Sequence, residues 1–105
     1  MEVKVFEQVE KVLRNESREI RQDLQDILEK LEIGFNLGMP HVKSLSSIFP
    51  GLCEIRIKDR NGQFRVIYFL KRDEAIYLVH AFREKTQKLP IKEIKTILKR
   101  IKEII

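Results

Sequence analysis

The sequence predicts an α+β fold in which an N-terminal helical hairpin packs on a small antiparallel β-meander and a final helix follows. Two observations carry this prediction. Residues 51–90 alternate apolar with polar side chains between turn signals, whereas residues 15–33 and 90–103 repeat apolar side chains at helical spacing. A chain of 105 residues is long enough for one hydrophobic core. We therefore expect a single domain that spans residues 1–105.

The longest predicted helix spans residues 15–33. Its apolar side chains recur every three or four positions, so that they lie on one face. That face consists of Ile20, Leu24, Ile27, Leu28 and Leu31. Asn15 or Ser17 can cap the first turn through a side-chain oxygen, and Gly34 can close the last turn.

A shorter helix is predicted ahead of it from the spacing of the apolar side chains near the N terminus. These side chains are Val3, Phe6, Val9, Val12 and Leu13. The alternation at residues 3–5 leaves a strand open as an alternative. The two helices would form a hairpin joined near residues 14–17. Residues 35–50 contain Gly, Pro and Ser without a clear period, and we interpret them as a connecting loop.

The first two strands of the meander are predicted around the dipeptide Asn61-Gly62, which favours a two-residue type I′ hairpin turn. Residues 52–58 alternate aliphatic with charged side chains, and residues 63–70 are rich in aromatic and β-branched ones. This turn fixes which residues face each other. The predicted pairs are Arg60–Gln63, Lys58–Arg65, Ile57–Val66, Arg56–Ile67, Ile55–Tyr68 and Glu54–Phe69. One face of the hairpin is then apolar and the other is basic.

A second turn near residues 72–75 leads into a third strand at residues 76–82. Centring this turn on Asp73 and Glu74 predicts the pairs Phe69–Leu78, Ile67–His80 and Arg65–Phe82. The basic face then collects Arg56, Lys58, Arg65 and His80. The opposite face would pack against helices. It consists of Cys53, Ile55, Ile57, Phe64, Val66, Tyr68, Leu70, Tyr77, Val79 and Ala81.

The third predicted helix runs from Leu89 or Pro90 to about Glu103. Proline fits the first turn of a helix, because the amide hydrogen that it lacks would have no partner there. One stripe of this helix is apolar and consists of Ile91, Ile94, Ile97, Leu98, Ile101 and Ile104. The other faces carry Lys92, Lys95, Lys99, Arg100 and Lys102.

The net charge of +5 and the pI near 9.5 suit a polyanionic partner, such as nucleic acid or an acidic protein. The basic surplus is concentrated after residue 40. A single cysteine, Cys53, excludes an internal disulfide, and we interpret it as a reduced core thiol of a cytoplasmic protein. No apolar run approaches the length that spans a bilayer, and residues 1–11 lack the apolar core of a signal peptide. We expect no membrane partner.

The sequence lacks the signatures of several common active sites. It has no glycine-rich phosphate loop and no Ser-His-Asp pattern, and His41 and His80 make a poor case for a metal site. We therefore expect no cofactor. The sequence offers instead guanidinium, ammonium and imidazole groups on one sheet face. RNA carries its own nucleophile, the 2′-hydroxyl, so these groups need only remove its proton, neutralise the phosphate and protonate the leaving 5′-oxygen.

Arg56 and Arg65 are candidate catalytic residues that bind the phosphate, because a planar guanidinium donates two hydrogen bonds and keeps its charge. Pairing with Glu54 or with helix carboxylates is the alternative. Arg65 is favoured because the predicted register places it opposite Lys58, and an anion would relieve the repulsion between them. His80 is the candidate acid or base, and a structural histidine is its alternative.

Four further residues are predicted near this site or beside it. Lys85 is a candidate catalytic residue and Lys88 a candidate RNA-binding residue, since both follow the last strand; a solvated basic loop is the alternative. Lys58 and Phe82 are candidate RNA-binding residues on the basic face, where the ring of Phe82 can stack on a base. His41, in the predicted loop, is interpreted as a surface residue.

Four segments, in this order and spacing, resemble the HigB-type branch of the RelE/ParE toxin superfamily, a phage-derived HigB-like family. They are NLGMPHVKSL, GLCEIRIKDRNGQFRVIYFL, IYLVHAF and KTQKLPIKEI. The resemblance implies a small cytoplasmic toxin of a type II toxin-antitoxin module that cleaves mRNA on the ribosome. It also implies an antitoxin, often with a helix-turn-helix domain, in a toxin-antitoxin hetero-oligomer. By motif, it implies a functional set of Arg56, Arg65, His80, Lys85 and Lys88, with Phe82 beside them.

Members of this superfamily often begin with a strand before the first helix, whereas this sequence starts almost at that helix. Two other functions stay open. A ParE-like inhibitor of DNA gyrase would bind protein and need no catalytic side chains, and the combination of His80, Arg65 and Lys85 argues against it. A degenerate toxin fold would serve only to hold the antitoxin.

Overall fold

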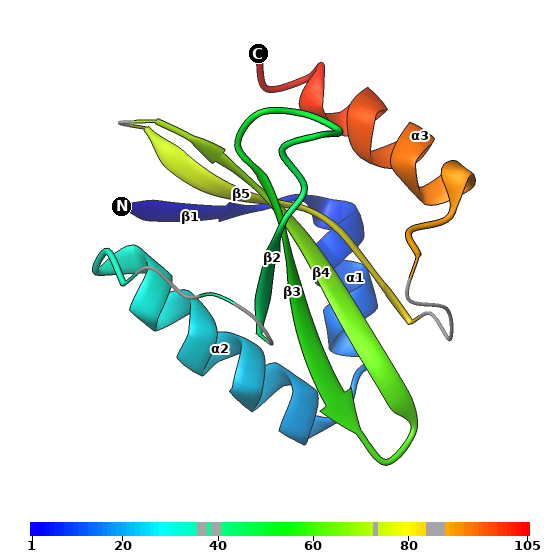
Figure 1. Cartoon of the computed structure of the whole chain (residues 1–105). Helices are drawn as coiled ribbons and strands as arrows, with labels where there is room; N and C mark the ends of the chain where they lie inside the picture. Colours follow the sequence, from blue (N-terminus) through cyan, green and yellow to red (C-terminus); the bar gives the residue numbers. More distant parts are fainter. Residues whose placement is uncertain (36–37, 39–40, 73, 84–87) are drawn as a thin grey trace.

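The computed structural model describes residues 1–35, 38, 41–72, 74–83 and 88–105, and it confirms the α+β class. Within these residues, helices cover both faces of a mixed sheet with the strand order β1-β5-β4-β3-β2 (Figure 1). The helices are α1 (Glu7–Arg14), α2 (Arg18–Glu32) and α3 (Ile91–Ile101). The strands are β1 (Glu2–Val5), β2 (Val42–Ser44), β3 (Leu52–Asp59), β4 (Gly62–Lys71) and β5 (Ala75–Arg83).

The chain begins with a strand, β1, ahead of the predicted helical hairpin. β1 pairs in parallel with β5, so that Val3 faces Ile76. The short helix therefore starts at Glu7 and excludes Val3, whose alternation with its neighbours marks the strand. The strand that the family resemblance implies before the first helix is thus present.

The helical hairpin covers one face of the sheet, as predicted. Ser17 caps α2, and its Oγ accepts a hydrogen bond from the Ile20 amide at 3.2 Å. Gly34 follows the end of α2 with φ +92°, a conformation that glycine adopts without a steric penalty. The buried core on this face joins α1 and α2 to β2, β3, β4 and β5, and Cys53 packs against it half-buried.

The first hairpin has the predicted faces but not the predicted register. Asp59 pairs with Gly62, so Arg60 and Asn61 form the two-residue turn. The Asp59 side chain accounts for this turn, since its Oδ1 accepts a hydrogen bond from the Asn61 amide at 2.9 Å. Gly62 then takes φ +116° as the first residue of β4.

The predicted pairs of this hairpin are consequently wrong by two positions. Arg56 faces Arg65, and Lys58 faces Gln63. A shift of two residues keeps every side chain on its predicted face, because side chains alternate with a period of two along a strand. The like charges that face each other are therefore two arginines, instead of Lys58 and Arg65.

The pairing of β4 with β5 confirms the position of His80. Arg65 faces Phe82 and Ile67 faces His80, as predicted. The tip of the predicted second turn includes residue 73, which lies outside the described residues. Arg65 and His80 therefore share one face of the sheet.

A β-bulge changes the register of the part of β5 that precedes His80. Val79 is the extra residue, so Phe69 pairs with Tyr77 and the predicted pair of Phe69 with Leu78 is wrong. The bulge turns Tyr77 and Val79 toward α3, whereas the sequence prediction placed both on the opposite face. No local sequence signal marks this bulge.

The face predicted to be basic is apolar over much of its area. α3 lies across it, with Ile97 and Ile101 buried against β-strand residues that include Leu52 and Phe69. The final helix is thus confirmed. It covers the apolar part of this face and borders the charged part. Its N-cap is Pro90.

Part of the predicted loop at residues 35–50 forms a strand, β2, which corrects that interpretation. Val42 is buried and faces Ile55 of β3. Three residues are too few to show an alternating pattern, which explains why the sequence did not indicate this strand. No helix among the described residues is long and apolar enough to cross a membrane.

Arg83, at the end of β5, links the helical hairpin to the β3–β4 turn. Its guanidinium bonds Glu16, between α1 and α2, at 2.7 Å and Asp59, at the β3–β4 turn, at 2.8 Å. Hydrogen bonding to Arg83 holds the pKa of Asp59 below its ordinary value of 3.8. This contact lies on the face of the sheet that α1 and α2 cover, opposite the candidate site.

Candidate functional site

The candidate site lies on the α3 face of β3, β4 and β5, where two rows of side chains cross the strands. The first row is Arg56, Arg65 and Phe82, and the second is Glu54, Ile67 and His80. Because neighbouring strands lie about 4.8 Å apart, each row spans roughly 10 Å. The sheet therefore brings four of the predicted residues together.

Glu54 lies between two arginines and forms an ion pair with each of them. Arg56 Nε donates to Glu54 Oε1 at 2.5 Å, and Arg65 Nε lies 3.7 Å from Glu54 Oε2. Arg65 and Glu54 are buried, with 0% and 1% of their side chains exposed, whereas 13% of Arg56 is exposed. The pairing with Glu54 that the sequence left open is thus present, and Arg56 is the arginine that reaches the surface.

Two residues of α3 hold the ring of His80. Its Nδ1 lies 3.0 Å from Arg100 Nη1, and its Nε2 bonds Glu93 Oε2. An arginine can only donate, so Nδ1 is the acceptor and Nε2 carries the proton that is donated to Glu93. Arg100 Nη1 also donates to the carbonyl oxygen of Val79 at 2.8 Å. His80 is consequently a neutral, oriented imidazole at the edge of α3.

The folding free energy should depend on pH through His80. Burial lowers its pKa below the ordinary 6.5, Glu93 opposes this without cancelling it, and Arg100 lowers the pKa further. The unfolded chain then binds more protons than the folded protein, so the free energy of unfolding falls as the pH drops below 6.5. Urea unfolding at a series of pH values should show this loss in the wild type and a flatter profile in His80→Gln. Equal profiles in the two proteins would contradict the assignment of this pH dependence to His80.

Phe82 is engaged within the cluster. Its ring stacks on His80 with centroids 5.1 Å apart, and the Arg65 guanidinium lies 6.0 Å from its centroid. One face of the ring is therefore used inside the protein. Stacking on an RNA base remains a prediction for this half-buried side chain.

A hollow of about 250 Å³ opens beside Glu54, between β2, β3 and the start of α3. It gathers three basic residues, Lys43, Arg56 and Lys88, together with Ser44. Such a set of donors suits a phosphate group. The structure thus places Lys88 at the rim of this face, as predicted, whereas Lys85 lies outside the described residues.

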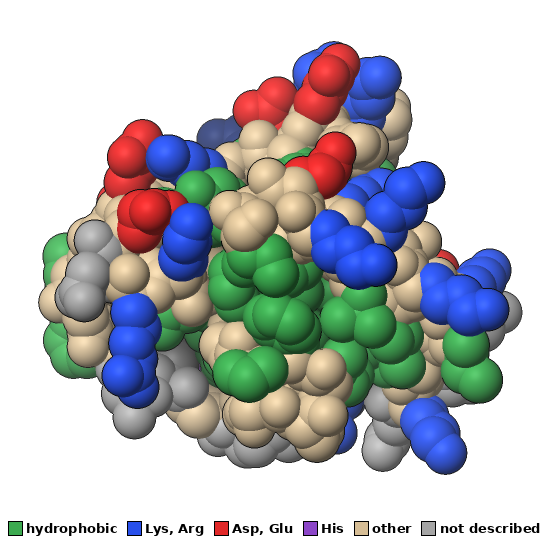
Figure 2. Space-filling model, turned by 90° about the horizontal axis from the view of Figure 1, so that it is seen from above, with side chains coloured by type: hydrophobic (Ala, Val, Ile, Leu, Met, Phe, Trp, Pro, Cys, Tyr) green, Lys and Arg blue, Asp and Glu red, His purple; other side chains and the backbone are tan. Residues whose placement is uncertain are grey.

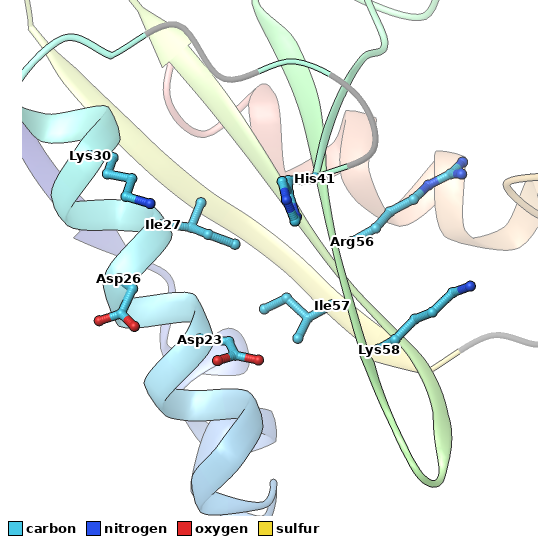
Figure 3. A pocket seen from close by; sticks show the side chains of 8 residues that line it. All are labelled: Asp23, Asp26, Ile27, Lys30, His41, Arg56, Ile57 and Lys58. Carbon is cyan, nitrogen blue, oxygen red and sulfur yellow. The ribbon is translucent and has the colours of Figure 1, made fainter.

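A second hollow, of about 410 Å³, lies between α2 and β3 (Figure 3). Its α2 side carries Asp23 and Asp26, which would repel a phosphate. Figure 3 shows the side chains of Arg56 and Lys58 pointing away from α2. Lys58 is exposed, and the exposed His41 beside this hollow fits its interpretation as a surface residue.

The sequence analysis did not identify Glu93 and Arg100 as site residues. The two are seven positions apart, with the buried Ile97 between them, so helical spacing places all three on one side of α3. That spacing could have indicated that Glu93 and Arg100 face the sheet together with Ile97. The described residues contain no group of three or more His, Cys, Asp or Glu side chains that could hold a metal ion.

Residues 11–102 match the sequence profile of the family described as "Phage derived protein Gp49-like (DUF891)", and this range includes α2, the last four strands and α3. This family is associated with toxin-antitoxin systems and has a RelE/HigB-type fold. A search of curated proteins found no match.

Proposed function

This chain belongs to the Gp49-like family of phage-derived proteins, and from that premise we propose that it is a toxin that cleaves mRNA on the ribosome. The family association supports the role in a toxin-antitoxin system. One observation supports the cleavage: Arg56 and His80 lie on one sheet face, and Arg56 lines a hollow together with Lys43 and Lys88. Membership of the HigB branch and a cytoplasmic location are part of the proposal.

In the proposed mechanism, Arg56 binds the scissile phosphate. Glu54 holds Arg56 Nε, and the buried Arg65 lies behind Glu54, so the guanidinium of Arg56 is oriented before RNA binds. The 2′-oxygen attacks the phosphorus, and the bond from phosphorus to the 5′-oxygen breaks. The products are a 2′,3′-cyclic phosphate and a 5′-hydroxyl. Arg56 stabilises the charge that develops on the phosphate during this step.

We assign proton transfer to His80 and Glu93 as a pair, which takes the proton from the 2′-hydroxyl and returns a proton to the leaving 5′-oxygen. They are joined by a hydrogen bond, and 13% and 15% of their side chains are exposed. The neutral imidazole that the lowered pKa favours is the form that can accept a proton. Because Arg100 occupies Nδ1, His80 can accept a proton there only after Arg100 moves aside. Lys85 keeps its proposed catalytic role by family resemblance.

The proposed partner is a cognate antitoxin, which the family association implies. We propose that it carries a helix-turn-helix domain and forms a hetero-oligomer with this chain. Its binding would neutralise the toxin.

Induced expression in bacteria tests this function. The wild type should arrest growth and create new 5′ ends within translated mRNAs, whereas Arg56→Gln should do neither. Lys11→Gln, an exposed change on α1, is the matched control and should behave as the wild type. Arrest without new 5′ ends would favour a gyrase inhibitor. No arrest would favour a fold retained only to bind the antitoxin.

A further inference from the structure

The outer side of α3 carries a stripe of lysines. The stripe consists of Lys92, Lys95, Lys99 and Lys102, and Lys88 precedes the helix. The four lysines of the stripe are three or four residues apart, which keeps them on one side of a helix, and they are exposed, as is Lys88. From Lys92 to Lys102 the stripe extends about 15 Å along the helix axis.

Two acidic residues lie in or just after α3, Glu93 and Glu103, and in the described part of the chain neither forms an ion pair with a lysine of this stripe. Glu93 points at His80, on the side that faces the sheet. In the part of the chain that the structure describes, Lys92, Lys95, Lys99 and Lys102 form no ion pair. Like charges three and four residues apart destabilise a helix slightly, and a bound polyanion relieves this repulsion.

The stripe leads away from the candidate site. Lys88 lines the same hollow as Arg56, and Leu89 and Ile94 place the start of α3 at that hollow. Figure 2, which views the molecule from the end where the C terminus lies, shows Lys and Arg side chains on both sides of an apolar area. A polymer bound in the hollow therefore meets further positive charge along α3.

We propose that the lysine stripe binds the phosphate backbone of RNA and positions the strand whose scissile phosphate lies in the hollow. This extends the proposed function, but the binding itself requires no cleavage. An RNA strand fits because its phosphates repeat at regular intervals and can continue from the hollow onto α3. The contacts are to phosphates, so the stripe contributes affinity without base preference.

Salt-dependent binding tests the stripe. The probe is a fluorescent, fully 2′-O-methylated single-stranded RNA, which has no free 2′-hydroxyl and cannot be cleaved by the proposed route. The stripe variant changes four lysines to glutamine: Lys92→Gln, Lys95→Gln, Lys99→Gln and Lys102→Gln. The control removes the same charge from exposed positions of α1 and α2: Arg14→Gln, Arg18→Gln, Arg21→Gln and Lys30→Gln. Circular dichroism checks that both variants fold.

The stripe variant should show a plot of log affinity against log salt whose slope is smaller by about 3, since each phosphate contact to a single strand contributes roughly 0.7. The control should keep the wild-type slope. An equal loss in both variants would show that only net charge matters, and an unchanged slope in the stripe variant would also overturn the proposal. Displacement of the RNA by polyglutamate at equal charge would favour an acidic polypeptide instead. None of these outcomes depends on whether the protein cleaves mRNA.

Discussion

Replacing Glu54 by alanine is expected to lower the free energy of unfolding by about 3 to 5 kcal/mol. The change removes the carboxylate that lies between Arg56 and Arg65, two arginines that face each other on neighbouring strands. Arg65 has no solvent exposure, so water cannot replace the lost negative charge. Urea unfolding at neutral pH measures the effect.

An exposed ion pair provides the control for this prediction. Glu7 lies 3.6 Å from Lys11 on α1, and most of both side chains is exposed. Glu7→Ala should therefore cost less than about 0.5 kcal/mol. If Glu54→Ala lowered the free energy of unfolding by less than about 1 kcal/mol, the ion pairs of Glu54 would not be a major source of stability.

Replacing Arg56 by alanine is expected to lower the rate of mRNA cleavage by about 10²- to 10³-fold, the usual cost of removing one preorganised donor at a developing charge. Arg56 is the partly exposed guanidinium of the site and lines the hollow. Its loss should leave the buried pair of Glu54 and Arg65 in place. Single-turnover cleavage of a ribosome-bound mRNA measures the rate.

Lys58 is the matched control, since it is the next exposed cation on the same strand and the same face, two residues further along. Lys58→Ala should change the rate of mRNA cleavage less than tenfold, because Lys58 would attract the phosphate backbone without contacting the scissile phosphate. Arg56→Lys should restore only part of the rate, because an ammonium group lacks the planar fork. Equal losses in Arg56→Ala and Lys58→Ala would contradict a specific role for Arg56.

The faces of the strands could be predicted from sequence, whereas their register could not. Alternation along β3 and β4 placed Arg56 and Arg65 on one face, and this survived the error in the turn because the shift was two residues. The turn itself depended on a hydrogen bond from the Asn61 amide to Asp59, which competes with the ordinary preference of Asn-Gly. The bulge at Val79 depends on packing against α3, which local sequence does not encode.

Contacts between distant segments account for what the sequence analysis missed in the candidate site. Arg100 lies 20 residues from His80 in the sequence, and their contact requires α3 to cross the sheet at one angle. The link from Arg83 to Glu16 joins residues 67 apart. Such pairs follow from tertiary packing, so the sequence identified Arg56, Arg65 and His80 as site residues but not the α3 residues that hold His80.

The chemistry of the cleaved ends shows whether the 2′-hydroxyl of the mRNA is the nucleophile. Purified protein is added to ribosomes carrying a defined mRNA, the cut position is mapped, and the mRNA is remade with a 2′-deoxy nucleotide on the 5′ side of that position. Attack by the 2′-hydroxyl should give fragments that end in a 2′,3′-cyclic phosphate and begin with a 5′-hydroxyl, and no cut at the deoxy position. Unchanged cleavage at that position, or fragments with a 3′-hydroxyl and a 5′-phosphate, would contradict it.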